Sequence, residues 1–192
     1  SVNINLSREE RRARSRRPRL TFDDGDVIRE RLTLPARVAV ESSTGTSVVG
    51  DNGRTASGVR LTAASAEIFQ IRDLDIQQGR AFSPLEAENG APVVVIGFET
   101  ADRVFEGLEP IGRSLRIRSF PYRVIGVLEE QGSLFGESLD NQIFVPAKSP
   151  ARAITAPRGN IEAVIIQAIN PDQLRDIQLE VEGIMRVRRQ LR

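Results

Sequence analysis

Prolines divide the middle of this chain into short segments, and no other feature constrains its fold as much. They stand at Pro92, Pro110, Pro121, Pro146, Pro150 and Pro157. A proline interrupts the hydrogen bonds of a helix, so long helices are excluded there. The apolar residues between the prolines come in short, β-branched runs, which predict strands at Val93–Phe98, Ser114–Arg118, Tyr122–Leu128 and Gln142–Val145. Residues 81–157 are therefore expected to be β-rich, with one helix at Glu99–Phe105.

The two ends of the chain carry strand and helix patterns of a different kind. Alternating apolar residues predict a strand at Ser1–Leu6, and Ile161–Ile169 predicts another. Thr21 and Asp24 favour a helix start before residues 22–33, which Pro35 closes. Asn170 and Pro171 begin the last helix. Its apolar stripe consists of Leu174, Ile177, Val181, Ile184 and Met185.

Between these regions, residues 38–61 predict a three-strand meander. Its strands are expected around Val38 and Val40, around Val48 and Val49, and around Val59 and Leu61. Asn52-Gly53 is a strong hairpin-turn signal. Ser65 is expected to cap a short helix that carries Ile68 and Phe69.

These elements together predict an α+β fold. With 192 residues, of which 40% are hydrophobic, the chain allows one domain with a smaller inserted lobe. We expect residues 1–80 and 158–192 to form one subdomain and residues 81–157 to form the insert. The longest apolar run, Ala91–Phe98, is far short of the roughly 18 residues that cross a bilayer.

The composition removes most familiar active sites. The chain has no cysteine and no histidine, which excludes disulfides, Ser-His-Asp triads, Cys-His dyads and zinc sites built from these ligands. Its net charge of +1 provides no global attraction to nucleic acid or anionic lipid. No catalytic, cofactor-binding or metal-binding residue is assigned, and the chain is not expected to be an enzyme.

Arginines are nevertheless concentrated near both ends. Arg8, Arg11, Arg12, Arg14, Arg16, Arg17 and Arg19 stand in the N-terminal segment, and Arg186, Arg188, Arg189 and Arg192 stand at the other end. The first group could be a nucleic-acid-binding arm, but a solvated loop gives the same pattern more often.

Three polar clusters are candidate sites. Gly50-Asp51-Asn52-Gly53 lacks the spacing of a phosphate-binding loop and is interpreted as a turn. Asp23, Asp24 and Asp26 are interpreted as carboxylates at a helix N-terminus, which they stabilise electrostatically, in preference to a metal site. Glu129, Glu130, Glu137 and Asp140 belong to a loop that is either solvated or the acid pair of a small hydrolase.

The segment Gly132–Gly136 within this loop is of interest for its apolar residues. Leu134 and Phe135 lie between the glycines, where a protruding loop would expose them. Exposed apolar side chains often mark a partner surface, although a loop that tucks them in is the alternative.

Read in order, a series of short motifs resembles one known family. It comprises Val2–Leu6, Leu20-Thr21, Val38-x-Val40, Gly58-Val59, Phe69-x-Ile71, Gly79-Arg80-x-Phe82, Val93–Gly97, Val104-Phe105, Pro110–Arg113, Val124–Leu128, Asp140-Asn141 and Ile143–Pro146. The chain is similar along almost its whole length to the extracytoplasmic, periplasmic core domain of MacB-type ABC-transporter permeases of the FtsX-like family. The basic segment Arg8–Arg19 and Gln190, where members often carry histidine, depart from the pattern.

The resemblance implies a porter-like subdomain formed by both chain ends and an inserted sabre-like β-rich subdomain. It implies a soluble domain at the periplasmic or extracellular face of the cytoplasmic membrane, in a permease that is a homodimer and works with a cytoplasmic ABC ATPase. The domain would pass on conformational changes by mechanotransmission and contact a membrane-fusion adaptor or a substrate. Release of lipoproteins or activation of a cell-wall hydrolase is the alternative within the family.

Overall fold

The computed structural model describes residues 3–7 and 19–190, and of residues 3–7 only the backbone. The chain forms two compact units. The terminal unit comprises Ser1–Glu41 and Arg158–Arg192, and the central unit comprises Ser42–Pro157. Both this grouping and the expected subdomains divide the chain between residues 157 and 158. They differ at the other boundary, because residues 42–80 make their contacts with the central unit.

The terminal unit is a small antiparallel sheet with helices. Strand β11 (Ala163–Ala168) lies between β1 (Asn3–Ser7) and the first residues of β2 (Ala36–Gly50), with Ile165 opposite both Asn5 and Ala39. Helix α2 (Phe22–Arg31) contacts α7 (Leu174–Gln190), which follows the short 3-10 helix η1 (Pro171–Gln173). The expected strands and helices at the chain ends are confirmed.

The apolar stripe of α7 forms part of the core of this unit. Ile177, Val181 and Met185 are buried, whereas Leu174 and Ile184 are half-buried. Asn170 caps the start of the helical region, since its side chain accepts a hydrogen bond from the amide of Asp172. Apolar residues spaced three and four apart therefore predicted the buried face of this helix correctly.

The central unit is a closed β-barrel. Its strands are hydrogen-bonded in the order β2, β3 (Thr55–Ala64), β10 (Gln142–Pro146), β5 (Val93–Ile96), β7 (Phe120–Leu128) and β6 (Ser114–Ile117), and β6 pairs with β2 again. Strand β4 (Ile76–Gly79) adds to the outside of β7. Closure leaves none of the six barrel strands as an unpaired edge.

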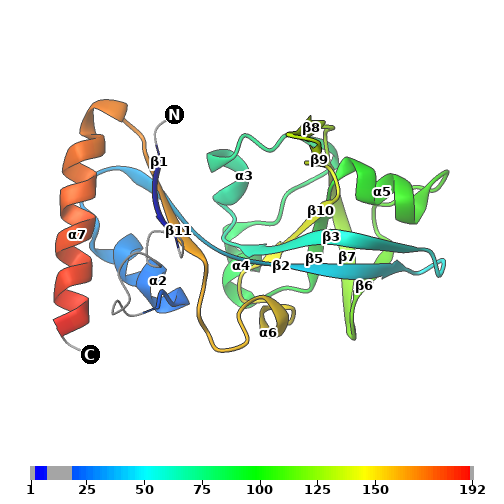
Figure 1. Cartoon of the computed structure of the whole chain (residues 1–192), viewed down its shortest axis with the longest axis horizontal. Coiled ribbons are helices and arrows are strands. Elements are labelled where there is room, and N and C mark those ends of the chain that lie inside the picture. The colour runs from blue at the N-terminus through cyan, green and yellow to red at the C-terminus, as the bar shows by residue number, and fades with distance from the viewer. Residues whose placement is uncertain (1–2, 8–18, 191–192) are drawn as a thin grey trace. The chain divides into compact units, whose positions relative to one another are not determined.

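Alternating side chains fill the barrel. Val48, Leu61, Ile96 and Leu115 belong to a buried core that Val104 and Phe105, at the end of helix α5 (Phe98–Phe105), complete. Helix α5 lies beside β3, β7 and β10 (Figure 1). The hydroxyl of Tyr122 donates to Ser149 Oγ at 2.8 Å and accepts from the amide of Ala151 at 2.8 Å. Burial raises the pKa of this hydroxyl, which keeps it protonated as a donor.

The predicted three-strand meander is wrong. Residues 36–50 form one strand of 15 residues, and β3 follows it directly in a two-stranded hairpin. Ser-Ser-Thr-Gly at 42–45, between the first two expected strands, stays extended within β2, which pairs with β3. Asn52-Gly53 does form the hairpin turn, where the Gly50 amide donates to the Arg54 carbonyl at 2.8 Å.

The expectation of a single helix between residues 81 and 157 is also incomplete. Two further short helices are present, α4 (Pro84–Asn89) and α6 (Arg152–Thr155). Ser83 and Glu86 form a capping box around Pro84 at the start of α4, so this sequence signal was available. The predicted helix near Ile68 is α3 (Ile68–Ile71), but its cap residue is Glu67 and not Ser65. In the described part of the chain, no helix is long and apolar enough to cross a membrane.

The Gly79-Arg80-x-Phe82 motif forms a tight corner after β4. Gly79 has φ +72° and lies opposite Gly126 of β7. A Cβ atom on Gly79 would lie 2.1 Å from the carbonyl oxygen of Ile125, and one on Gly126 would lie 2.3 Å from that of Arg80. Phe82 is buried edge-on against Phe69, with 4.9 Å between ring centroids. The motif thus has a complete structural explanation in this chain.

Arg80 of the same motif stabilises α4 in a pH-dependent way. Its guanidinium lies 2.6 Å from Glu86 Oε1, and this contact lowers the pKa of Glu86 to about 2. A carboxyl group with a lowered pKa stabilises the fold above its unfolded-state pKa, and the contribution is lost as pH falls towards 2. Because the Arg80 side chain is 57% exposed, solvent screening limits the contribution to about 1 kcal/mol.

We therefore expect Glu86→Gln to lower the free energy of unfolding by about 1 kcal/mol at pH 6. The difference from the parent chain should shrink as pH falls below 4.5 and be small at pH 2, where the folded-state carboxylate is itself about half protonated. Urea unfolding of the variant and the parent chain at both pH values measures this difference in the free energy of unfolding. Glu88→Gln is the control, because the ion pair of Glu88 with Lys148 is at the surface. A Glu86→Gln difference that does not depend on pH would contradict the assignment.

Candidate functional site

A small β-hairpin at residues 133–138 carries the most exposed apolar side chain of the described residues. Strands β8 (Ser133–Leu134) and β9 (Glu137–Ser138) pair through Leu134 and Glu137. Phe135 at its tip is 97% exposed and Leu134 is 55% exposed. The loop that was expected to expose both residues does so.

The backbone at this tip is unusual for an aromatic residue. Phe135 has φ +50° and Gly136 has φ +84°, so both central residues of the turn are left-handed, as in a type I′ turn. Asparagine usually takes the first of these positions, and a bulky residue there costs on the order of 1 kcal/mol. An exposed phenylalanine in a strained backbone gains no burial in return. Burial within the described residues therefore does not account for an aromatic side chain at this position.

The base of the hairpin is fixed by Asp140. Its carboxylate accepts hydrogen bonds from the amides of Gln131 at 2.7 Å and Gly132 at 2.8 Å, and its own amide donates to Ser138 Oγ at 3.1 Å. Asp140 is 5% exposed, so these amide donors replace the water that a carboxylate needs. The tip is therefore presented on a rigid base.

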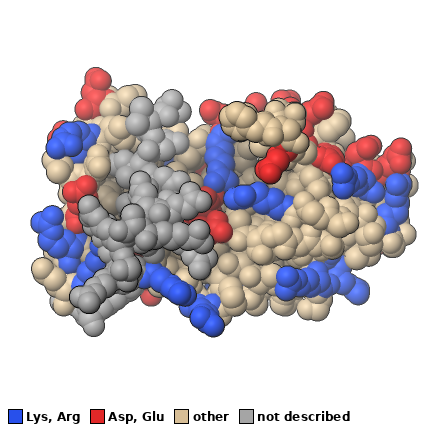
Figure 2. Space-filling model, viewed as in Figure 1, with Lys and Arg blue, Asp and Glu red and all other residues tan. Residues whose placement is uncertain are grey.

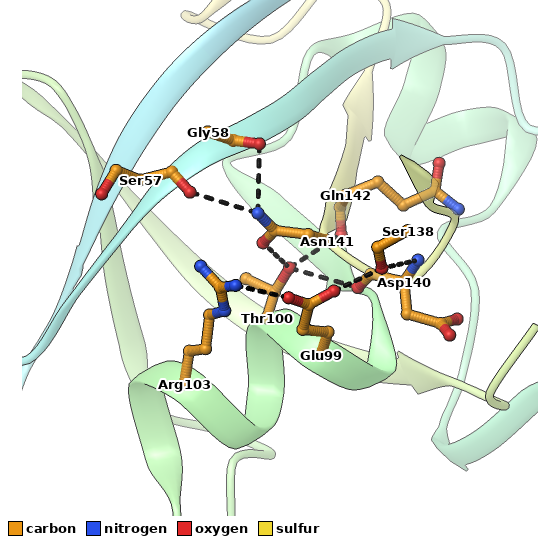
Figure 3. A network of polar contacts seen from close by, with 9 residues as sticks. All are labelled: Ser57, Gly58, Glu99, Thr100, Arg103, Ser138, Asp140, Asn141 and Gln142. Atoms are coloured by element: carbon orange, nitrogen blue, oxygen red, sulfur yellow. Dashed lines mark hydrogen bonds and ion pairs between the residues drawn. The ribbon is translucent and has the colours of Figure 1, made fainter. Parts of the chain in front are cut away.

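A polar network connects this base to α5 and to the barrel (Figure 3). The side chain of Glu99 contacts Ser138 Oγ and pairs with Arg103 at 2.6 Å. The amides of Glu99 and Thr100, at the start of α5, donate to the Asp140 carbonyl at 3.2 and 3.3 Å.

Asn141 continues this network into strand β3. Its side-chain amide donates to the carbonyls of Ser57 at 3.1 Å and Gly58 at 3.0 Å (Figure 3). Its carbonyl oxygen accepts from the Thr100 hydroxyl at 3.2 Å. The hairpin base, α5 and β3 are thereby held together by hydrogen bonds.

An open pocket of about 380 Å³ lies beside the hairpin. Its lining residues are Phe98, Glu99, Asp102, Glu130, Gly132, Ser133, Ser138 and Asp140. Within residues 19–190, neither Asp102 nor Glu130 has a hydrogen-bond or ion-pair partner. Acidic side chains gather over β8, β9 and α5 on the face seen in Figure 2. Acidic side chains thus lie close to the exposed tip of the hairpin.

The four acidic residues of this loop that the sequence singles out take different positions in the structure. Glu130 and Asp140 line the pocket, whereas Glu129 and Glu137 are exposed and do not. Asp140 uses both carboxylate oxygens to hold the loop, which is a structural role. Phe98 and Asp102 were not singled out, because only the fold brings the start of α5 beside a loop some 30 residues away.

The other clusters have structural explanations. Asp24 is 2% exposed, and its carboxylate accepts hydrogen bonds from Arg188 Nε at 2.5 Å and from the Thr21 amide at 2.8 Å. Asp26 pairs with Arg29 at 3.1 Å. Asp23 is exposed. Among the described residues, no three acidic side chains come close enough to hold a metal ion. The basic segment is not described apart from Arg19, which is exposed, since Arg8–Pro18 lie outside the described residues, as does Arg192.

Comparison with known proteins gives relatives that are export ATP-binding/permease proteins. MacB of Neisseria gonorrhoeae, a macrolide export ATP-binding/permease protein, is 29% identical over 136 residues, which are 71% of this chain and 21% of that protein. PvdT of Pseudomonas aeruginosa, a pyoverdine export ATP-binding/permease protein, is 27% identical over 161 residues, which are 83% of this chain and 24% of that protein. The chain therefore spans about a fifth to a quarter of the length of these relatives.

Solved structures share the fold. The periplasmic region of MacB from Actinobacillus actinomycetemcomitans matches with a TM-score of 0.76 at 17% identity, over 96% of this chain and 81% of that one. The extracellular domain of the transporter YknZ from Gram-positive bacteria matches with a TM-score of 0.69 at 20% identity, over 92% and 88%. The MacB-like periplasmic core domain family matches residues 2–184. With its motifs, its α+β fold and this match in agreement, the chain belongs to the MacB-like periplasmic core domain family.

Proposed function

We propose that this chain is the extracytoplasmic domain of an ABC-transporter permease and that it transmits motion without catalysing a reaction. The family match over residues 2–184 carries the proposal. The names of the relatives, which join ATP-binding and permease parts, support a cytoplasmic ATPase as the source of the motion. The same names support export over lipoprotein release or hydrolase activation. The domain would lie on the periplasmic or extracellular side, in a homodimeric permease.

The porter-like and sabre-like subdomains belong to the same proposal. We expect both chain ends to form the porter-like part and residues 81–157 to form the sabre-like part, although residues 42–80, assigned to the porter-like part from the sequence, make their contacts with the barrel. The chain passes between the units twice, after Glu41 and after Pro157. A domain with two crossings can pass on a displacement of either unit through two covalent connections.

The hairpin tip supplies the contact with an adaptor or a substrate in this proposal. Phe135 and Leu134 offer apolar surface on a base that Asp140 and Glu99 hold in place. Aromatic side chains are enriched among the residues that dominate binding energy at protein interfaces. A rigid base also lowers the entropy cost of binding.

The test uses the complete permease, obtained by cloning the reading frame on both sides of this segment. Replacing residues 3–190 with a flexible Gly-Ser linker should abolish export while ATP hydrolysis in proteoliposomes persists. An undiminished export rate would overturn the proposal. So would a reading frame that encodes no apolar runs of roughly 20 residues beside this segment.

The tip makes a separate prediction in the same permease. Phe135→Ser should reduce export about tenfold, because it removes the exposed aromatic contact. It should leave the thermal unfolding of the domain unchanged, since the ring is 97% exposed. Leu85→Ser is the matched control, because Leu85 is 69% exposed on α4 of the same unit. Equal effects of the two variants on export would contradict a specific role of the tip.

A further inference from the structure

Three exposed arginines, which we call the arginine face, lie on β6, on β7 and in the turn between them: Arg116, Arg123 and Arg118. Side chains alternate along these strands, so Leu115, Ile117 and Tyr122 fill the core while the arginines are exposed. Basic side chains are visible over β6 in Figure 2.

The strand register places the arginine face in a continuous surface. Arg116 lies between Val49 of β2 and Pro121 of β7, and Arg123 lies opposite Ser114. Arg116 and Arg123 are diagonal neighbours in this register, and the Cβ atoms of such neighbours are about 7–8 Å apart. Val49 is 37% exposed beside them. The face combines positive charge with small apolar and hydroxyl side chains.

Within the described residues, the side chains of these three arginines have no hydrogen-bond or ion-pair partner, unlike those of most cations of the central unit. Arg54 pairs with Glu106, Arg80 with Glu86, Arg103 with Glu99, Arg113 with Asp51, and Lys148 with Glu88. These five cations are paired with acidic side chains, whereas the arginine face keeps its positive charge.

Such a face is unfavourable in the isolated domain. Like charges on neighbouring positions of a sheet repel each other. Arg118 adds backbone strain, because it has φ +52° and is not a glycine. The chain carries a net charge of only +1, so the cluster does not follow from a general excess of arginine over acid. A negatively charged partner would remove the repulsion.

We propose that the arginine face binds an acidic protein segment, whose Asp or Glu side chains pair with the three guanidinium groups. Arginine binds carboxylates through two parallel hydrogen bonds, which suits this residue choice. Val49 and Pro121 give apolar contacts between the charges, as mixed protein surfaces require. Nucleic-acid binding usually neutralises more phosphates than three arginines can contact. A membrane surface favours long or aromatic anchors, and the apolar neighbours here are short.

The experiment measures binding of a fluorescein-labelled peptide of alternating Glu and Ala, ten residues long, to the 192-residue chain at 50 mM salt. Binding should weaken about tenfold in the triple variant Arg116→Gln, Arg118→Gln, Arg123→Gln, and should weaken with added salt. The control triple variant Arg175→Gln, Arg186→Gln, Arg189→Gln removes the same charge from exposed positions of α7. NMR signals of the Nε–H groups of Arg116, Arg118 and Arg123 should shift during the titration.

The possible results distinguish an acidic protein segment from a membrane or a nucleic acid as the partner of the arginine face. The test does not depend on the proposed transport function. The triple variant should unfold at the same or a higher temperature than the parent chain, which excludes unfolding as the cause of lost binding. No peptide binding, or an equal loss in the control variant, overturns the proposal. Binding that is seen only with phosphatidylglycerol vesicles or with duplex DNA also overturns it, in favour of a membrane or a nucleic acid.

Discussion

Replacing Phe82 with alanine is expected to lower the free energy of unfolding by about 3–5 kcal/mol. The side chain is 3% exposed and packs edge-on against Phe69, with an interplanar angle of 75°. Phe69 in turn packs against Phe144 of β10 at 5.7 Å. Truncation removes the aromatic contact and leaves a cavity at the corner between β4 and α4. Few single substitutions in this chain should cost more.

Urea unfolding of the isolated chain at neutral pH measures this loss. Phe135→Ala is the matched control, because the same truncation at a side chain that is 97% exposed should change the free energy of unfolding by less than about 0.5 kcal/mol. A loss of under about 1 kcal/mol at Phe82 would show that the corner is not part of the cooperative core.

Replacing Gly79 with alanine is expected to cost about 3 kcal/mol, from two separate causes. The left-handed backbone, with φ +72°, disfavours any Cβ atom by about 1 kcal/mol. The remainder comes from the collision of that atom with the Ile125 carbonyl oxygen, 2.1 Å away. Because this neighbour is backbone, it cannot rotate aside, and β4 must move away from β7.

Gly112→Ala separates the two causes. Gly112 has φ +87°, but a Cβ atom there would meet no other atom within 4 Å. Its substitution should therefore cost only about 1 kcal/mol. Thermal and urea unfolding of both variants give the comparison. Equal losses at Gly79 and Gly112 would mean that the close approach of β4 to β7 adds nothing to stability.

Both predictions assign the Gly-Arg-x-Phe motif to architecture. Gly79 allows the strand contact, Arg80 pairs with Glu86 at the start of α4, and Phe82 fills the corner. Gly126, from the motif Val124–Leu128, completes the same contact from the other strand. Two motifs that carry the resemblance to the family thus meet at one point, where backbone atoms need the space that a side chain would occupy.

The candidate site was only partly accessible to sequence reasoning. Leu134 and Phe135 between two glycines indicated an exposed apolar loop, because glycine favours turns and nothing nearby in the sequence could cover them. The role of Asp140 was not accessible. Its carboxylate holds the amides of Gln131 and Gly132, and a sequence does not show which of several acids in a loop turns inward.

The sequence by itself determined the family and many, though not all, of the local elements. Periodic apolar residues predicted α7, and β-branched runs between prolines predicted β5, β6, β7 and β10. Only the tertiary structure decided that β2 is a single strand of 15 residues and that β6 pairs with it to close a barrel. Strand pairing joins residues far apart in the chain, and its hydrogen bonds are the same for every side chain, so local patterns carry no record of it.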